Sequence, residues 1–256
     1  MASPGGVSLP GLAATLAGTA LVASGSMTLN MLIERDVDAL MRRTRGRPLP
    51  TGRLRPADAL GFGVLLTALG TLLLALTTNL LATGVALLTW ASYLFAYTPL
   101  KTRTSLSTIV GAFPGALPPV IGWAAARNAL EPGAYVLFAI MFLWQIPHFL
   151  AIAWIYREDY ARGGFPMLPV LDPAGHITGR QAVANCLALL LVSVVPSFAG
   201  MTNRVYLWGA LALGVGFTAV AVVAATKRTT AAARALFLAS VLYLALLSAL
   251  LLTTRI

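Results

Sequence analysis

The sequence is poor in cysteine, histidine and charge. Its 256 residues include one cysteine, two histidines and eight acidic residues, and charged residues make up 10% of the chain. The single cysteine, Cys186, excludes an internal disulfide framework and any metal site built from several cysteines. Soluble domains are closer to a quarter charged, so the composition argues against an ordinary soluble protein.

Long apolar stretches take the place of the missing charge. Hydrophobic residues make up 58% of the chain and the mean hydropathy is +0.83. A helix needs roughly 20 apolar residues to cross a bilayer. On that criterion we expect an all-α, polytopic membrane helical bundle with eight spans, at residues 10–33, 57–77, 79–97, 105–125, 133–156, 181–199, 205–226 and 232–253. The N-terminal MASPGGVSLP lacks a basic region, so we expect no cleavable signal peptide.

The excess of positive charge has a membrane explanation. The net charge of +10 would suggest nucleic acid for a soluble protein, but here we expect no nucleic-acid partner. Fourteen basic residues fall in alternate loops, at residues 35–55, 101–103, 157–180 and 227–228, against Arg127, Arg204 and Arg255 on the other side. The positive-inside rule then predicts that the charged loops are cytoplasmic. It does not explain why most acidic residues lie on that same side.

The stretch NMLIERDVDALMRRTRGRPLP, residues 30–50, combines both signs of charge. If the first helix continues past Asn30, then Asn30, Glu34 and Asp38 follow one another at four-residue steps and share one face. An amide and two carboxylates offer the hard oxygen ligands that Mg²⁺ prefers. Arg42 and Arg43 follow one turn later, and arginine binds diphosphate oxygens well.

Two interpretations of this stretch remain open on the residues alone. It predicts a charged mouth in which acids hold a metal and arginines hold a diphosphate. It is also compatible with an interfacial loop whose acids only neutralise neighbouring arginines.

A resemblance favours the first interpretation. The stretch resembles the NxxxDxxxD motif of the UbiA-type intramembrane prenyltransferases, and NMLIERDVD followed by MRRTRGRPLPTG resembles most closely the protoheme IX farnesyltransferase (haem O synthase) branch of that family. One departure is that Glu34 stands where the general motif has Asp. The metal ligands that the resemblance implies are Asn30, Glu34 and Asp38, with Asp159 as a further one.

The stretch YTPLKTRTSLSTIVGAFPGALPPVIGW, residues 97–123, supplies two more cations. Lys101 and Arg103 can be topology charges or substrate contacts. The resemblance of YTPLK to the family implies a functional Lys101, whereas Arg103 stays evenly balanced as a substrate-binding residue. The run of Gly and Pro from Gly111 to Gly122 breaks helix regularity within a span, which is tolerated where backbone faces protein or a cavity. We therefore expect it to form a wall of a substrate chamber.

The stretch FLWQIPHFLAIAWIYREDYARGGFPMLPV, residues 142–170, resembles the same branch in WQIPHF and in DYxxGGxPMLP. Prenyltransferases that act on phenols usually carry a DxxxD here, and this chain has Ile155 four residues before Asp159. Asp159 is the best second metal ligand. Arg157 and Tyr160 are candidate substrate contacts, and Glu158 is a weaker candidate ligand.

His148 is an ionisable residue within a predicted span, which by default marks a functional site. If one helix runs through to Asp159, His148 lies about three turns away on the same face, together with Gln145. His148 and Gln145 are therefore candidate substrate-binding residues, and His148 could contact a porphyrin or ligate its iron. The alternative is a histidine that is merely hydrogen-bonded within the bundle. His176 is expected in a loop, without a role.

The resemblance also implies an activity and a setting. It implies one intramembrane prenyltransferase domain over residues 1–256, with a central cavity open to the cytoplasmic side and apparently without the family's first helix. The activity would be transfer of farnesyl from farnesyl diphosphate to the 2-vinyl group of haem b, with Mg²⁺ as cofactor. Asn30, Glu34, Asp38 and Lys101 would be catalytic.

The setting implied is the bacterial inner membrane, with a haem A synthase as a possible partner downstream. Two alternatives remain: a related prenyltransferase with an aromatic or quinone-precursor acceptor, and a transporter.

Overall fold

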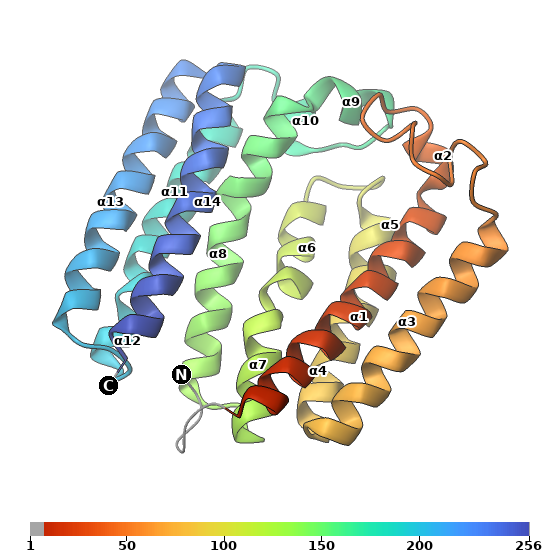
Figure 1. Cartoon of the computed structure of the whole chain (residues 1–256). Helices are drawn as coiled ribbons and strands as arrows, with labels where there is room; N and C mark the ends of the chain where they lie inside the picture. Colours follow the sequence, from red (N-terminus) through yellow and green to blue (C-terminus); the bar gives the residue numbers. More distant parts are fainter. Residues whose placement is uncertain (1–7, 256) are drawn as a thin grey trace. The chain divides into compact units, whose positions relative to one another are not determined.

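The computed structural model describes residues 8–255 and confirms an all-α architecture (Figure 1). Within these residues the only extended pairing is one isolated bridge between Thr202 and Arg255. Eight helical segments are long and apolar enough to cross a membrane: Leu9–Ile33, Pro56–Thr77, Leu80–Leu100, Ser107–Arg127, Pro132–Ile155, His176–Phe198, Arg204–Lys227 and Thr230–Thr253. All eight predicted spans are thus confirmed.

The sixth span begins earlier than predicted. It starts at His176 rather than at residue 181, so the expectation that His176 lies in a loop is wrong. The cause is a capping interaction: Asp172 Oδ2 accepts hydrogen bonds from the backbone N–H of Thr178 at 2.8 Å and from its Oγ1 at 3.0 Å. A carboxylate at a helix N-terminus satisfies free N–H groups and stabilises the helix dipole, which allows helix formation ahead of the apolar run.

The described residues group into two compact units. The N-terminal unit consists of residues 8–134 and 158–166, and the C-terminal unit of residues 135–157 and 167–255. Helices of the N-terminal unit are α1 (Leu9–Ile33), α2 (Arg35–Asp38), α3 (Pro56–Thr77), α4 (Leu80–Ala91), η1 (Ser92–Tyr97), α5 (Thr98–Leu100), α6 (Ser107–Ala116), α7 (Pro118–Arg127) and α9 (Arg157–Arg162). Helices of the C-terminal unit are α8 (Pro132–Ile155), α10 (Leu168–Leu171), α11 (His176–Ser193), α12 (Val195–Phe198), α13 (Arg204–Lys227) and α14 (Thr230–Thr253).

Helices α1 and α3 lie side by side because glycines remove the side chains between them (Figure 1). Gly18 and Gly25 of α1 are seven residues apart, as are Gly63 and Gly70 of α3, so each pair marks one face of its helix. A Cβ on Gly70 would lie 2.7 Å from the Gly18 carbonyl oxygen and 2.8 Å from the Val22 nitrogen. Such close backbone approach is a usual way to pack helices in lipid, where little hydrophobic force drives association.

Three local irregularities shape the N-terminal unit. The predicted continuous helix through Asn30 is interrupted for one residue at Glu34 (φ −91°, ψ 4°), yet the backbone bonds Glu34 N–H to Asn30 and Asp38 N–H to Glu34 keep the four-residue register. A six-residue π-helix, η1, precedes Thr98; such wider turns frequently occur at functional sites. The Gly/Pro run divides its span at Leu117 into α6 and α7, as predicted.

The α1–α3 contact yields a stability prediction. Gly70→Ala should destabilise the protein by about 1–3 kcal/mol, because the new methyl group would meet backbone atoms that cannot move aside. Thermal unfolding in detergent would measure the change. Gly61→Ala on the same helix is the matched control, since a Cβ there meets nothing within 4 Å. Equal unfolding temperatures for the two variants would contradict the close packing.

Candidate functional site

A buried ion pair forms the centre of the N-terminal unit. Lys101 Nζ lies 2.9 Å from Glu34 Oε1 and 3.1 Å from Oε2, and the two side chains are only 12% and 11% exposed. Removing two charges from water is costly unless geometry and further hydrogen bonds compensate. Asn30 Nδ2 donates to Glu34 Oε2 at 2.8 Å and the Lys101 ammonium lies 4.6 Å from the centre of the Tyr97 ring, which offsets part of this cost. Glu34 Oε1 is buried and has the ion pair with Lys101 but no hydrogen bond within the described residues.

Asn30 is oriented by a residue that sequence reasoning missed. Its Oδ1 accepts a hydrogen bond from Thr98 Oγ1 at 2.8 Å and lies 3.4 Å from Lys101 Nζ. Thr98 Oγ1 also lies 2.9 Å from the Tyr93 carbonyl oxygen, across the π-helical turn. The wider turn thus places Thr98 and Lys101 on the face that meets Asn30 and Glu34. Thr98 lies within the YTPLK stretch, but only the tertiary contact reveals its role.

Asp38 is the most deeply buried acid of the motif, at 1% exposure. Its Oδ2 pairs with Arg47 Nη1 at 2.7 Å, and its backbone carbonyl accepts from the Thr44 hydroxyl. Arg47 is a second residue that the sequence did not single out among several arginines. Asp36, by contrast, is 86% exposed, in keeping with its place opposite Glu34 on the helix.

Asp159 holds the loop after α2 in place. Its Oδ1 and Oδ2 accept the backbone N–H groups of Arg42 at 3.1 Å and Arg43 at 3.2 Å, and Arg162 donates to Oδ1 from the side chain. Burial by itself would raise the pKa of the Asp159 carboxyl. The bonds from Arg162, Arg42 and Arg43 outweigh that effect and hold the pKa below its ordinary value. Asp159 therefore stays ionised at neutral pH.

The arginines of the predicted site differ in how they are held. Arg43 donates to the Tyr160 hydroxyl at 3.5 Å and its guanidinium lies 5.7 Å from the centre of that ring. Arg42 and Arg103 are exposed, and their side chains make no hydrogen bond or ion pair within residues 8–255. Arg157 stacks on Trp154, 4.8 Å from the ring, within the C-terminal unit. The structure thus brings Asn30, Glu34, Asp38 and Lys101 into one buried region and leaves Arg42 and Arg103 at the surface.

His148 does not share one continuous helix with Asp159. That expectation is wrong, because α8 ends at Ile155 and Asp159 lies in α9. His148 Nδ1 instead lies 2.7 Å from Ser240 Oγ of α14, and the ring packs between Trp144 and Phe237. Gln145 is buried and donates to the Met141 carbonyl one turn earlier in α8. Gln145 and His148 both lie on α8.

The donor set fits a hard cation by chemistry, although cationic side chains occupy it in this structure. Asn30 Oδ1 and the Glu34 carboxylate hold the Lys101 ammonium, and Asp38 holds the Arg47 guanidinium. Within the described residues no three His, Cys, Asp or Glu side chains lie close enough to one another to hold a metal. A metal would therefore depend on the Asn30 amide and on phosphate oxygens as further ligands, which is usual for Mg²⁺.

The Asp159 contacts yield a prediction that needs no activity assay. Asp159→Asn should speed tryptic cleavage after Arg42 and Arg43 about tenfold, because two backbone N–H groups and Arg162 lose a charged acceptor. Mass spectrometry of the fragments would measure the rate. Asp36→Asn is the control, since that carboxylate is exposed. Equal cleavage rates in the two variants would contradict the holding role.

The carboxylate's contribution also has a pH dependence. Because the pKa of Asp159 is lowered in the folded state, its stabilisation is present above the unfolded value of about 3.9. It is lost as the pH falls through the lower folded value.

Comparisons with known proteins point in one direction. The model of the UbiA prenyltransferase family matches residues 1–249. A protein named protoheme IX farnesyltransferase from Solibacter usitatus is 53% identical over 94% of this chain and 82% of its own length. A protein of the same name from Salinibacter ruber is 44% identical over 98% of this chain and 88% of its own.

Solved structures agree in fold. A digeranylgeranylglyceryl phosphate synthase superimposes with a TM-score of 0.79 at 16% identity, over 99% of this chain and 88% of that one. A UbiA homologue from Archaeoglobus fulgidus bound to GPP and Mg²⁺ superimposes with a TM-score of 0.68 at 17% identity, over 96% and 89%. The fold and the eight apolar helices together make this chain an integral membrane protein.

Proposed function

The chain belongs to the UbiA prenyltransferase family, and on that premise we propose that it farnesylates haem. It transfers a farnesyl group from farnesyl diphosphate to the 2-vinyl group of protoheme IX (haem b). Water adds in the same reaction, and the products are haem O and diphosphate. The observation that carries the proposal is the 53% identity, over 94% of the chain, with a protein named for this reaction. Haem O then serves haem–copper oxidase biogenesis, directly or through a haem A synthase.

The N-terminal unit binds the diphosphate in this proposal. Mg²⁺ would be held by Asn30, Glu34 and Asp38, and it would neutralise the diphosphate as a leaving group. For Asp159 to serve as a further ligand, it would first have to release the backbone of Arg42 and Arg43. Lys101 then exchanges part of its pairing with Glu34 for phosphate oxygens. The Arg42 side chain has no hydrogen bond or ion pair among the described residues and would add a second cation.

The chain's own cations stabilise the charge that develops as the bond to diphosphate breaks. The terminal carbon of the vinyl group captures the allylic farnesyl cation, and the positive charge moves to the adjacent carbon, where water adds and loses a proton. No nucleophile is therefore needed from the protein. Apolar walls must exclude water from the cation until this bond has formed. The basic loops that carry Arg42, Arg43 and Lys101 face the cytoplasm of a bacterial cell, and the membrane is the inner membrane.

One experiment tests the whole proposal. Purified protein in nanodiscs is incubated with haem b, farnesyl diphosphate and Mg²⁺, and the haem is analysed by mass spectrometry. A haem heavier by one farnesyl group plus one hydroxyl group supports the proposal. If haem stays unmodified and an aromatic or quinone-precursor compound is prenylated in a parallel sample, that compound is the acceptor and haem is not. Ion or solute flux in liposomes, without prenyl transfer to any acceptor, would refute the proposal that the protein is an enzyme and would favour a transporter.

Lys101 gives a prediction that separates the two substrates. Lys101→Met should weaken farnesyl diphosphate binding at least tenfold and leave haem binding nearly unchanged, because the proposal places Lys101 against the oxygens of the diphosphate and not against the propionates of haem. Isothermal titration with each substrate would measure both affinities. The variant also leaves Glu34 buried without its partner. The double variant Lys101→Met with Glu34→Gln removes that charge and reports on folding, and equal losses for both substrates would indicate a structural defect instead.

His148 is proposed as an acceptor contact on the basis of its hydrogen bonding. Ser240 Oγ donates to the Phe237 carbonyl at 2.5 Å, so its proton is already committed. It must then accept from His148 Nδ1–H, and the proton on Nδ1 leaves a lone pair on Nε2. A neutral imidazole with a free Nε2 and an Nδ1–H held by a neighbour is the form that ligates iron. Gln145 would lie one turn away as a further contact.

His148→Ala should therefore shift the Soret band of the haem-loaded protein and weaken haem binding, measured by absorption titration without farnesyl diphosphate. Ser240→Ala removes only the partner of Nδ1, so it should retain the ligand and cause a smaller shift. An unchanged spectrum and affinity in His148→Ala would leave the residue as a packing group between Trp144 and Phe237.

A further inference from the structure

A groove on the C-terminal unit is lined by none of the residues assigned above to prenyl transfer. It runs between α11 and α13, and the empty space along it, including the part open to the surroundings, is about 1120 Å³. Small residues create it: a Cβ on Gly179 would lie 2.8 Å from the Ala225 Cβ, so the two helices meet closely there. Larger side chains of both helices then form the walls on either side of this contact.

The groove changes from basic to apolar along its length. His176 and Arg180 line one end, and Val183, Leu187 and Val222 line the remainder. From Arg180 to Leu187 the helix rises about 10 Å. The groove therefore presents the Arg180 guanidinium and the His176 imidazole at the end of the helix and hydrocarbon surface below them.

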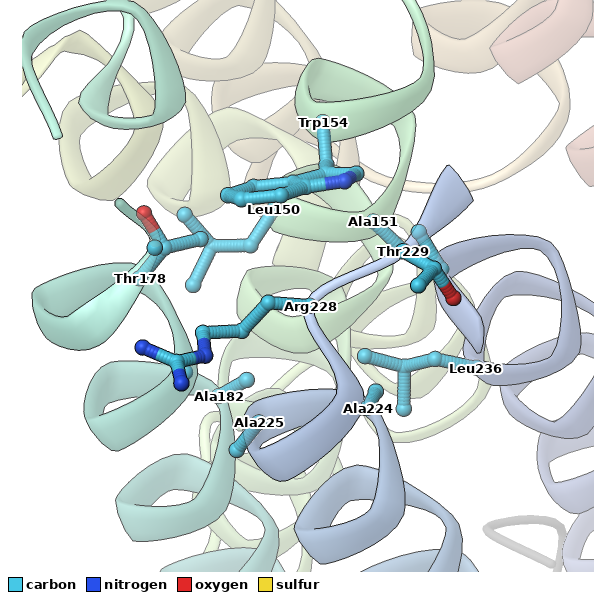
Figure 2. Close-up of a pocket in the computed structure, with 13 residues that line it drawn as sticks. Leu150, Ala151, Trp154, Thr178, Ala182, Ala224, Ala225, Arg228, Thr229 and Leu236 are labelled. Carbon is cyan, nitrogen blue, oxygen red and sulfur yellow. The ribbon is translucent and has the colours of Figure 1, made fainter. Parts of the chain in front are cut away.

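Arg228 adds a cation that is held in place. It ends α13 in a left-handed conformation (φ 49°), and its Nη1 lies 2.8 Å from His176 Nε2 on α11. Figure 2 shows its side chain reaching away from the backbone among Ala182 and Ala225, below the Trp154 ring. The pocket drawn in Figure 2, which Arg228 helps to line, has an empty volume of about 360 Å³. Arg228 is exposed, and the contacts of its Nη1 with His176 and with the Ala174 carbonyl oxygen at 3.5 Å keep the guanidinium near the basic end of the groove.

Neither Arg180 nor Arg228 forms an ion pair with an acidic residue within residues 8–255. Asp172 is the only acidic residue among residues 135–157 and 167–255. Burial would raise the pKa of its carboxyl, but hydrogen bonds from Thr178 and the first turn of α11 outweigh burial and lower it, so this charge serves to cap the helix. Arg180 is exposed and makes no side-chain hydrogen bond or ion pair within the described residues. The positive-inside rule explains basic residues at a membrane boundary, but not an apolar groove continuing directly below them.

We propose that this groove binds one anionic phospholipid. Arg180 and Arg228 hold the phosphate, and an acyl chain lies between α11 and α13 along Val183, Leu187 and Val222. A basic pocket between membrane helices is the kind of site that recognises anionic headgroups. The phosphate supplies the acceptor oxygens that the fork of donors on each guanidinium matches, and the chain covers apolar surface.

Native mass spectrometry of the purified protein with matched lipids tests the proposal. Phosphatidylglycerol should bind in preference to phosphatidylcholine with the same acyl chains. Arg180→Gln should lower phosphatidylglycerol affinity about fivefold, the factor that corresponds to about 1 kcal/mol for one basic residue near a membrane surface. Arg204→Gln is the matched control, because Arg204 is exposed at the other end of α13 and outside the groove. Equal affinity in the two variants, or no preference between the lipids, would overturn the site.

A second variant tests the acyl chain. Ala184 is exposed and lines the groove, so Ala184→Trp should fill it and reduce phosphatidylglycerol binding, while thermal unfolding confirms that the variant is folded. Unchanged binding in a folded Ala184→Trp protein would overturn the groove as the chain's location. Glycerol phosphate without acyl chains should fail to displace the lipid at equal concentration. Full displacement would reduce the site to free phosphate binding and refute the proposal.

Discussion

The pairing of Glu34 with Lys101 is the interaction on which the N-terminal unit depends. Both side chains are almost fully buried in a chain whose surroundings are largely hydrocarbon. An isolated charge in that position would cost several kcal/mol, so the local structure must bring the partners together. The break at Glu34, the π-helical turn before Thr98 and the close packing of α1 on α3 each contribute to that placement.

In the proposed function the same oxygens would serve two cations in turn. Asn30 Oδ1, the Glu34 carboxylate and Asp38 already hold an ammonium and a guanidinium, and a diphosphate with its metal would compete for these partners. The protein's cations can then move to the phosphate oxygens without leaving any charge unpaired. A site that keeps its charges balanced both with and without substrate avoids the desolvation penalty in either state. Asp159 contributes differently, by fixing the backbone that carries Arg42 and Arg43.

The C-terminal unit shows how a polar residue in a span is given one defined state. Ser240 commits its proton to a backbone carbonyl, which sets the tautomer of His148 from the second helix. Elsewhere in this unit Arg180 of α11 and Arg228 at the end of α13 share the unit with a single acidic residue, Asp172. The Asp172 carboxylate caps α11. In our proposal an anionic phospholipid of the bilayer pairs with these charges through its phosphate and covers the apolar groove with an acyl chain.

Much of this protein is determined by the sequence alone. Eight apolar runs are sufficient to predict eight spans, because hydrocarbon tolerates only backbone that satisfies its own hydrogen bonds. The four-residue spacing of Asn30, Glu34 and Asp38 likewise places them on one face. The resemblance of the YTPLK stretch to the family singles out Lys101, which the structure pairs with Glu34. The early start of the sixth span was missed because it depends on a carboxylate four residues ahead of the helix rather than on hydropathy.

Only the tertiary structure decided which residues meet. Thr98, Arg47 and the bond from His148 to Ser240 join segments that are far apart or turn unexpectedly, and no periodicity reports such contacts. Extending one helix from His148 to Asp159 failed because α8 stops at Ile155. Spacing determines a face only as long as the helix continues, whereas the partner of a buried charge is chosen by the packing that surrounds it.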